Sequence, residues 1–207
     1  MSQYKSSMFS DAVYLFGKTF SSAPSLNFLI REELPDGTKV DPEKLAVQAV
    51  LAAFAYLYNK KLIDIVLGER EGKRKTKTAE VKKLQSSAPD TSGLEAVIFT
   101  SIRDNSDIYD ITVGLLQRKS VNPWGAVLNI VKKNLLDRGI LKQVEKRKVL
   151  FITTHKNVVN EDISKEEQQV TELKKTLEEL QSKGELYKKI LSDIASGISS
   201  RVKDTGG

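Results

Sequence analysis

The segment from Asn122 to Asn160 constrains the fold more than any other part of the chain, because its first half is a clearly marked helix. The side chain of Asn122 can cap the amides of a helix start, and Pro123 suits the first helical position, where no backbone donor is needed. Gly139 then provides a typical helix stop. Between them, apolar residues recur at spacings of three and four, which predicts one buried face. These residues are Trp124, Val127, Leu128, Val131, Leu135 and Leu136.

The second half of this segment predicts a short hairpin. Residues 140–144 and 148–152 are rich in branched side chains and flank the polar corner 145–147. A threonine–histidine loop that ends at His155 follows the second strand. The whole segment is therefore predicted to form a helix followed by a hairpin.

The same arrangement is predicted upstream. Asp41 and a proline open a helix over 42–59 that is apolar on most faces, so we expect it to lie centrally. Residues 62–67 and 78–84 then have the pattern of two strands around an exposed turn at 68–76. Each of the two long apolar helices thus carries its own hairpin.

Shorter elements are predicted around these two units. They are helices over 10–16, 93–101 and 107–118, the first capped by Ser10 and the last by Asp107, and a turn at 35–37.

Two amphipathic helices are predicted after residue 160. Ser164 and Glu167 form a capping box at the start of the first, and Gly184 separates it from the second. Each helix has an apolar stripe that we expect to dock on the core, with pairing to another chain or to a membrane as the alternative. The stripes are Val170, Leu173, Leu177 and Leu180, and then Leu186, Ile190, Leu191, Ile194 and Ile198.

These patterns predict a mainly α fold with short β-hairpins, in the α+β class. We expect an irregular N-terminal segment with a short helix over 1–40 and a helical core with two hairpins over 41–160. Amphipathic helices over 161–200 and a tail over 201–207 complete the predicted organisation. The tail is predicted to be disordered, most clearly from Lys203 onward.

Three motifs, in this order along the chain, resemble the Golgi phosphoprotein 3 family. LAAFAYLYNKKLIDI at 51–65 is similar to an apolar helix of the family that ends in a basic turn and a strand. SSAPDTSGLEAV at 86–97 is similar to its proline and threonine turn before a leucine-led helix. LLDRGIL at 135–141 and VLFITTH at 149–155 resemble its glycine turn, hairpin and threonine–histidine loop. The resemblance covers residues 45–180.

The resemblance implies a helical, non-catalytic domain that binds phosphatidylinositol 4-phosphate at a membrane surface. In the eukaryotic members it also implies retention of glycosyltransferases in the Golgi through their cytosolic tails. The family's headgroup pocket uses a tryptophan before the first apolar helix and arginines in two helices. Here no tryptophan precedes that helix, and Ala49, Gly125 and Leu128 lie near the arginine positions. We therefore expect a divergent, shortened member and carry over no headgroup residue.

Composition limits the chemistry. The chain has one histidine, His155, and no cysteine, which excludes thiolate metal sites, histidine metal clusters and a Cys–His pair. A serine-based triad would need His155 as its base. We expect a protein without catalysis, cofactor or metal. No secretory signal and no run of about 20 apolar residues occurs, so a cytoplasmic protein, peripheral on a membrane, is predicted.

Basic residues provide the candidate contacts for lipid headgroups or other phosphates, since the net charge of +6 favours anionic partners. One group lies at the tip of the first predicted hairpin. The other lies before and along the helix that begins at Pro123, near the candidate membrane-interface residue Trp124. A solvated loop and a core tryptophan are the alternatives. The first group is Arg70, Lys73, Arg74, Lys75 and Lys77, and the second is Arg118, Lys119, Lys132 and Lys133.

The predicted function is that of a peripheral membrane or adaptor protein that binds phosphoinositide-type lipids, with protein tails or self-association as further partners. A winged helix that binds nucleic acid is the alternative, because two predicted helices, 107–118 and the one from Pro123, precede a hairpin. Lysines 132 and 133 and residues 146–148 would then contact phosphates, with Asn129 and Arg138 available to read bases.

Overall fold

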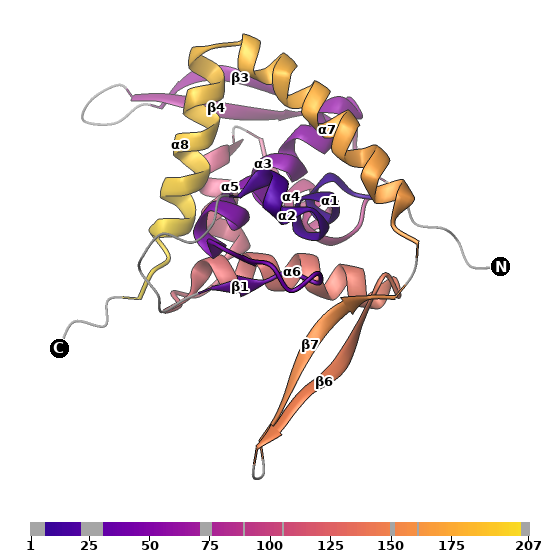
Figure 1. Cartoon of the computed structure of the whole chain (residues 1–207). Helices are drawn as coiled ribbons and strands as arrows, with labels where there is room; N and C mark the ends of the chain where they lie inside the picture. The colour runs from indigo at the N-terminus through magenta and orange to yellow at the C-terminus, as the bar shows by residue number, and fades with distance from the viewer. Residues whose placement is uncertain are drawn as a thin grey trace.

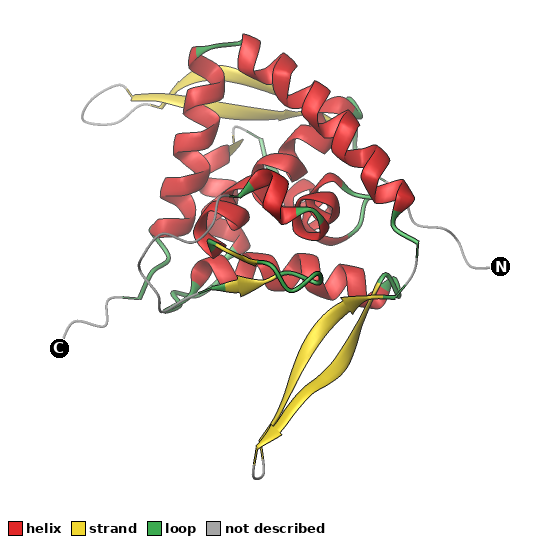
Figure 2. Ribbon diagram, in the orientation of Figure 1, coloured by secondary structure: helices red, strands yellow, loops and turns green. Residues whose placement is uncertain are grey.

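The computed structural model describes residues 7–21, 31–70, 76–88, 90–104, 106–149, 152–160 and 162–203, of which 70, 146–149 and 152–154 are described by their backbone alone. Helices dominate this part of the chain and confirm the predicted mainly α fold with small antiparallel hairpins (Figure 1, Figure 2). The helices are α1 (Phe9–Leu15), α2 (Gly17–Phe20), α3 (Pro42–Asn59), α4 (Gly93–Ser101), α5 (Ile108–Leu115), α6 (Pro123–Asp137), α7 (Ser164–Ser182) and α8 (Glu185–Ser199). The strands are β1 (Glu32–Glu33), β2 (Lys39–Val40), β3 (Ile63–Arg70), β4 (Thr76–Lys83), β5 (Ser106–Asp107), β6 (Leu141–Val149) and β7 (Ile152–Val159).

Helix α3 is the centre of the core, as predicted. Twelve of its 18 residues are buried, and α1, α4, α6, α7 and α8 all pack against it (Figure 1). Its start is also confirmed: the carboxylate of Asp41 accepts the N–H groups of Glu43 at 3.0 Å and Lys44 at 3.4 Å. An apolar helix can occupy this position because its backbone groups are bonded within the helix and its amides are capped.

Removing the cap should have a measurable effect. We expect Asp41→Ala to lower the free energy of unfolding by about 1 kcal/mol, because two amides at the start of α3 lose their acceptor. Urea denaturation followed by far-UV circular dichroism measures the loss. Asp41→Asn keeps a side-chain oxygen and should cost much less; equal losses in the two variants would show that Asp41 does not act as a cap.

Helix α1 lies inside the fold rather than on it. All seven of its residues are buried, among α3, α6 and α7. The prediction that Ser10 caps this helix is wrong, since the helix begins at Phe9 and Ser10 lies in its first turn. The N–H of Ser10 instead donates to the carboxylate of Glu95, 85 residues away on α4. A cap supplied by another helix leaves no local sequence pattern.

The two C-terminal helices dock on the core, as expected, and the exposed alternative is wrong for their apolar stripes. Leu173 and Leu180 of α7 are fully buried, as are three isoleucines of α8, and the other members of the stripes are buried or half-buried. The predicted capping box is wrong. Ser164 lies inside α7, and its N–H and hydroxyl donate to Asp162, which lowers the pKa of the Asp162 carboxyl.

The first hairpin, β3–β4, is longer at its outer end than predicted, and β4 also pairs with the two-residue strand β5. Its strands extend to Arg70 and begin again at Thr76, within what was predicted as a turn, because a half-exposed strand tolerates polar residues. The predicted turn at 35–37 is confirmed between β1 and β2, where Gly37 has φ +86°.

The second hairpin departs most from expectation. The predicted corner at 145–147 is a bulge inside β6, and the predicted threonine–histidine loop is part of β7. The paired strands continue to Val149 and Ile152 (Figure 1). The error has a physical cause, since a ribbon that projects into solvent can be polar on both faces and its polar residues do not mark a turn.

Two other boundaries also differ. Helix α5 ends at Leu115, short of the predicted Arg118, and the chain then leads Ser120 into a parallel bridge with Val202. Lys203 donates its N–H to the carbonyl of Ser120 at 2.9 Å, so residues 201–203, predicted as part of the tail, are held against the loop before α6. Residues 204–207, like 22–30, lie outside the described residues.

Among the described residues, no helix combines the length and apolar character needed to cross a bilayer.

Candidate functional site

The first predicted basic group falls mostly outside the described chain. Residues 73–75 are not described, and for Arg70 the structure gives only the backbone at the end of β3. Lys77 is exposed, and its Nζ lies 2.6 Å from Oε1 of Glu185 at the start of α8. Lys77 therefore has a carboxylate partner, and its charge is largely compensated within the chain.

The second predicted group is divided between different surroundings. Arg118 and Lys119 are exposed in the loop between α5 and α6. Lys132 instead pairs with Glu32 of β1, with Nζ 3.2 Å from Oε1, while Lys133 is exposed. Because α6 turns by about 100° per residue, these two neighbouring lysines point in different directions, and the helix does not combine them into one phosphate site.

Trp124 belongs to the core more than to the surface. It lies in the first turn of α6, is half-buried and packs against the core cluster. Its ring Nε1 is buried and has no hydrogen-bond partner among the described residues. This position matches the alternative of a core tryptophan and gives no support to a role at a membrane interface.

The ribbon formed by β6 and β7 is the feature that projects furthest from the helical body (Figure 1). Its root is fixed: Leu141 is buried, and the N–H of Asn160 donates to the carbonyl of Ile140 at 2.9 Å. Beyond the root, described side chains become exposed on both strands, including Lys142 and Lys156. The described part of the ribbon therefore has exposed side chains on both strands.

Positive charge is concentrated on this ribbon. Residues 141–159 contain five basic residues and one acidic residue, a formal net charge of +4, whereas the whole chain carries +6. Val149 and Ile152 form the last residue pair of the ribbon, and the two residues between them in the sequence are leucine and phenylalanine. The sequence at the outer end is therefore apolar. A cationic shaft with an apolar end is the arrangement that a charged lipid surface would attract.

Sequence reasoning considered residues 146–148 only as nucleic-acid contacts and overlooked Lys142 and Lys156. The signal was present in the spacing of cations across 142–156, but the corner predicted at 145–147 shortened the hairpin and placed Lys156 in a loop.

His155 lies on the same ribbon, exposed and opposite Glu145 in the register. No group of three histidine, aspartate or glutamate side chains in the described part of the chain could hold a metal ion. In the described part of the chain, His155 therefore belongs to no such metal-binding group.

A second set of ionisable groups lies inside the molecule and joins α1, α4, α6 and α7. The carboxylate of Asp11, on α1, is fully buried and accepts from Nδ2 of Asn134 at 3.0 and 3.1 Å. Arg138 donates to the same carboxylate and also reaches Glu166 of α7, where the Nη2–Oε1 distance is 3.4 Å. The arginine of the LLDRGIL motif is therefore an internal counter-ion.

Glu95 is the neighbouring acid, and it is also fully buried. The N–H of Ser10 donates to Oε1 at 2.9 Å, and Oγ of Ser10 lies 2.7 Å from Oε2. Burial, together with repulsion from Asp11, raises the pKa of Glu95 to about 8. Burial also raises the pKa of Asp11 to about 6, although the Arg138 guanidinium and the Asn134 amide act in the opposite direction. Glu95 is thus mainly protonated at neutral pH.

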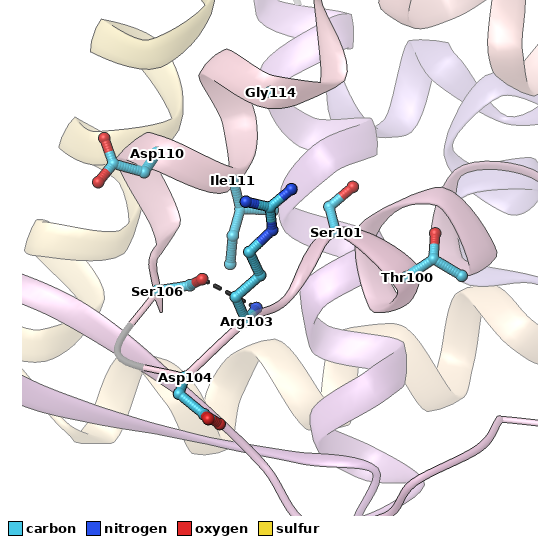
Figure 3. Close-up of a pocket in the computed structure, with 8 residues that line it drawn as sticks. All are labelled: Thr100, Ser101, Arg103, Asp104, Ser106, Asp110, Ile111 and Gly114. Atoms are coloured by element: carbon cyan, nitrogen blue, oxygen red, sulfur yellow. Dashed lines mark hydrogen bonds between the residues drawn. The ribbon is translucent and has the colours of Figure 1, made fainter.

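The described surface also has a pocket of about 540 Å³ between α4, α5 and the loop that joins them. Its lining is Thr100, Ser101, Arg103, Asp104, Ser106, Asp110, Ile111 and Gly114 (Figure 3). The hydroxyls of Thr100 and Ser101 donate to carbonyls of α4, and Oγ of Ser106 accepts the N–H of Arg103. Figure 3 shows both aspartates pointing away from the arginine. These hydrogen bonds join none of the three hydroxyls to Asp104 or Asp110.

The geometry required for a winged helix is only partly present. Helix α5 packs mainly on α8, whereas α6 packs on α3 and α4. Arg138, which the alternative uses to read bases, is held by Asp11 and Glu166. Asn129 and Lys133 remain exposed on α6.

No family model, curated protein or solved structure matches this chain. The resemblance to the Golgi phosphoprotein 3 family stays a prediction.

Proposed function

We propose that this chain is a non-catalytic, peripheral membrane-binding protein of the adaptor type, which binds anionic lipid headgroups through the β6–β7 ribbon. The concentration of charge on the ribbon is the observation that carries the proposal, since +4 of the chain's +6 lies on one projecting arm. Each lysine or arginine near an anionic leaflet contributes about 1 kcal/mol of attraction. Five such residues are enough for reversible attachment.

The apolar outer end of the ribbon supports a lipid surface as the partner. Soluble hairpins usually close with glycine, asparagine or aspartate, whereas here the sequence between Arg147 and Thr153 is Lys-Val-Leu-Phe-Ile. Apolar side chains gain free energy at the boundary between headgroups and acyl chains, while neighbouring lysines keep contact with phosphates. A phosphoinositide, as the resemblance implies, supplies the highest headgroup charge for such a group of cations.

Charge reversal on the ribbon should weaken membrane binding. We expect Lys142→Glu combined with Lys156→Glu to lower the partition coefficient by on the order of thirtyfold, because two cations at about 1 kcal/mol each are lost before any new repulsion is counted. Co-sedimentation with neutral vesicles, phosphatidylserine vesicles and vesicles containing phosphatidylinositol 4-phosphate, at near-physiological salt, measures the change.

Lys174→Glu combined with Lys175→Glu is the matched control. These two lysines are exposed on α7, so the control makes the same change in net charge on a different surface. It should bind vesicles almost as well as the wild type. Equal losses in the two double variants would show that net charge, rather than the ribbon, controls binding.

Duplex DNA as a soluble competitor separates lipid binding from the nucleic-acid alternative. Phosphoinositide binding that DNA does not relieve supports the proposal. Absence of vesicle binding, together with retention of DNA that depends on Lys142 and Lys156, would overturn it in favour of a nucleic-acid partner.

A further inference from the structure

Strand β3 forms the outer edge of its sheet. The strand order is β3-β4-β5, so β3 pairs with β4 on one side only. In the described chain, no backbone hydrogen bond connects the other side of β3 to a further element. An edge of this kind presents a row of donors and acceptors that another strand can satisfy.

The register shows which backbone groups lie on that edge. In an antiparallel pair, alternate residues bond to the partner strand and the residues between them point away. The N–H of Leu84 donates to the carbonyl of Leu62 at 2.9 Å, so the bonded residues of this strand are even-numbered. The N–H of Ile65 confirms the alternation, because it donates to the side chain of Asp64 at 2.8 Å instead of to β4.

Strand β4 shows the complementary pattern. Ala79, which faces Leu67 in the register, donates its N–H away from β3, to Asp193 of α8 at 3.2 Å. The backbone groups of Ile63, Ile65 and Leu67 therefore point to the open edge.

The edge carries little of the usual protection against pairing, since Asp64 is its one charged residue between Ile63 and Leu67. Natural edge strands carry lysine, proline or a bulge. Strand β6 has both Lys142 and a bulge, whereas Ile63–Leu67 of β3 reads Ile-Asp-Ile-Val-Leu and pairs with β4 without a register shift. The side chain of Leu67 is 40% exposed.

We propose that β3 is an interaction surface at which a second copy of this chain pairs, antiparallel, to form a continuous six-stranded sheet about a two-fold axis. Such a self-complementary contact is the commonest kind in homodimers. The open groups lie on odd-numbered residues, which allows a register centred on Val66 with Ile65 opposite Leu67 of the other copy. Asp64 of one copy then faces Gly68 of the other, and no two like charges lie opposite each other. Self-pairing requires this, because like charges directly opposite destabilise a strand pair.

Asp64 has a defined part in this proposal. Its carboxylate occupies the N–H of Ile65, one of the donors that the second copy would use. Asp64→Ala should therefore tighten the dimer by roughly tenfold, which corresponds to one hydrogen bond in a typical protein context.

A proline on the open edge tests the proposal. Because the N–H of Leu67 points away from β4, Leu67→Pro removes an outward donor and leaves the β3–β4 bonds in place. Light scattering coupled to size-exclusion chromatography, over a range of concentrations, should show a dimer for the wild type and for Leu67→Ala, but a monomer for Leu67→Pro with an unchanged circular dichroism spectrum. A monomeric wild type, or a dimeric proline variant, overturns the proposal.

Cross-linking provides a second measurement that does not depend on how well the proline variant folds. The chain has no cysteine, so Val66→Cys introduces a single thiol at the proposed axis. Residues at a non-hydrogen-bonded antiparallel pair lie about 4.5 Å apart at Cα, within disulfide range. Val66→Cys should form a covalent dimer under mild oxidation, and Val121→Cys, at a side chain 61% exposed, should not. Equal rates for the two would overturn the proposal, and neither result depends on membrane binding.

Discussion

Replacing Arg138 with methionine should lower the free energy of unfolding by about 3–5 kcal/mol, because it leaves buried carboxyl groups without their counter-ion. Asp11 is fully buried and Glu166 nearly so, and Arg138 donates to both. The free energy of unfolding of a typical domain is roughly 5–15 kcal/mol, so a loss of this size is a large part of it. Urea denaturation at neutral pH measures it.

Arg103→Met is the matched control. The side chain of Arg103 is exposed and has no acidic partner within the described part of the chain, so its loss should change stability by less than about 0.5 kcal/mol. Combining Arg138→Met with Asp11→Asn should cost less than the two single changes added together, by about 1–3 kcal/mol, since the neutral amide no longer needs the guanidinium. A small loss in Arg138→Met, or simple additivity, would contradict the role of Arg138 as the internal counter-ion.

The free energy of unfolding should fall as pH rises from about 4.5 to about 8, because Glu95 keeps its proton in the folded chain. The folded state raises the pKa of Glu95 from 4.5 to about 8, so within this window the folded chain holds a proton that the unfolded chain has released. Stability falls with pH wherever the folded state binds more protons. Asp11 adds a loss between pH 3.8 and about 6 with the same sign.

Glu95→Gln should remove most of this dependence. The neutral amide can accept the N–H of Ser10 through its oxygen, and its nitrogen can donate to Oγ of Ser10, because a hydroxyl oxygen is also an acceptor. We expect the variant to match the wild type near pH 5 and to exceed it by on the order of 5 kcal/mol near pH 9, since each unit of pKa shift corresponds to about 1.4 kcal/mol.

Chemical denaturation at several pH values compares the two profiles. Ser10→Ala, which removes the hydroxyl partner but leaves the acid, should retain the fall with pH. Parallel profiles for the wild type and Glu95→Gln would show that Glu95 ionises normally in the folded chain.

The elements with local signals were predicted well from the sequence. The bounds of α3 and α4 are as predicted, and Asn122 caps α6 by accepting the N–H of Gly125 at 2.8 Å. A cap, a proline in the first turn and an apolar period of three or four all act within a few residues, so a single sequence contains them.

The buried network could not be predicted in the same way. Arg138 and Asp11 are separated by 127 residues, and Ser10 and Glu95 by 85. Sequence reasoning treated Arg138 as a surface cation available to nucleic acid, since no short-range pattern distinguishes a counter-ion inside the protein from a charge in solvent. Only the packing of four helices brings these groups together.

The lipid-binding surface that we propose lies on a different segment from the one predicted from the sequence. Positive charge and a phosphate-bearing partner were expected, at the first hairpin and on α6. Lys77 and Lys132 have acidic partners within the fold, whereas the ribbon bears most of the net charge. The difference arises because net charge is a sum over the sequence, while pairing depends on neighbours in space.

The burial of α1 has a consequence for synthesis of the protein on the ribosome. Ser7, just before α1, bonds to Glu166 of α7, 159 residues later. At roughly 5–20 residues per second, α7 is made on the order of ten seconds or more after α1. Throughout that interval the apolar surfaces of α1 and α3 have no C-terminal cover. The nascent chain is therefore exposed to aggregation and to chaperone binding for longer than a protein whose core forms between neighbouring helices.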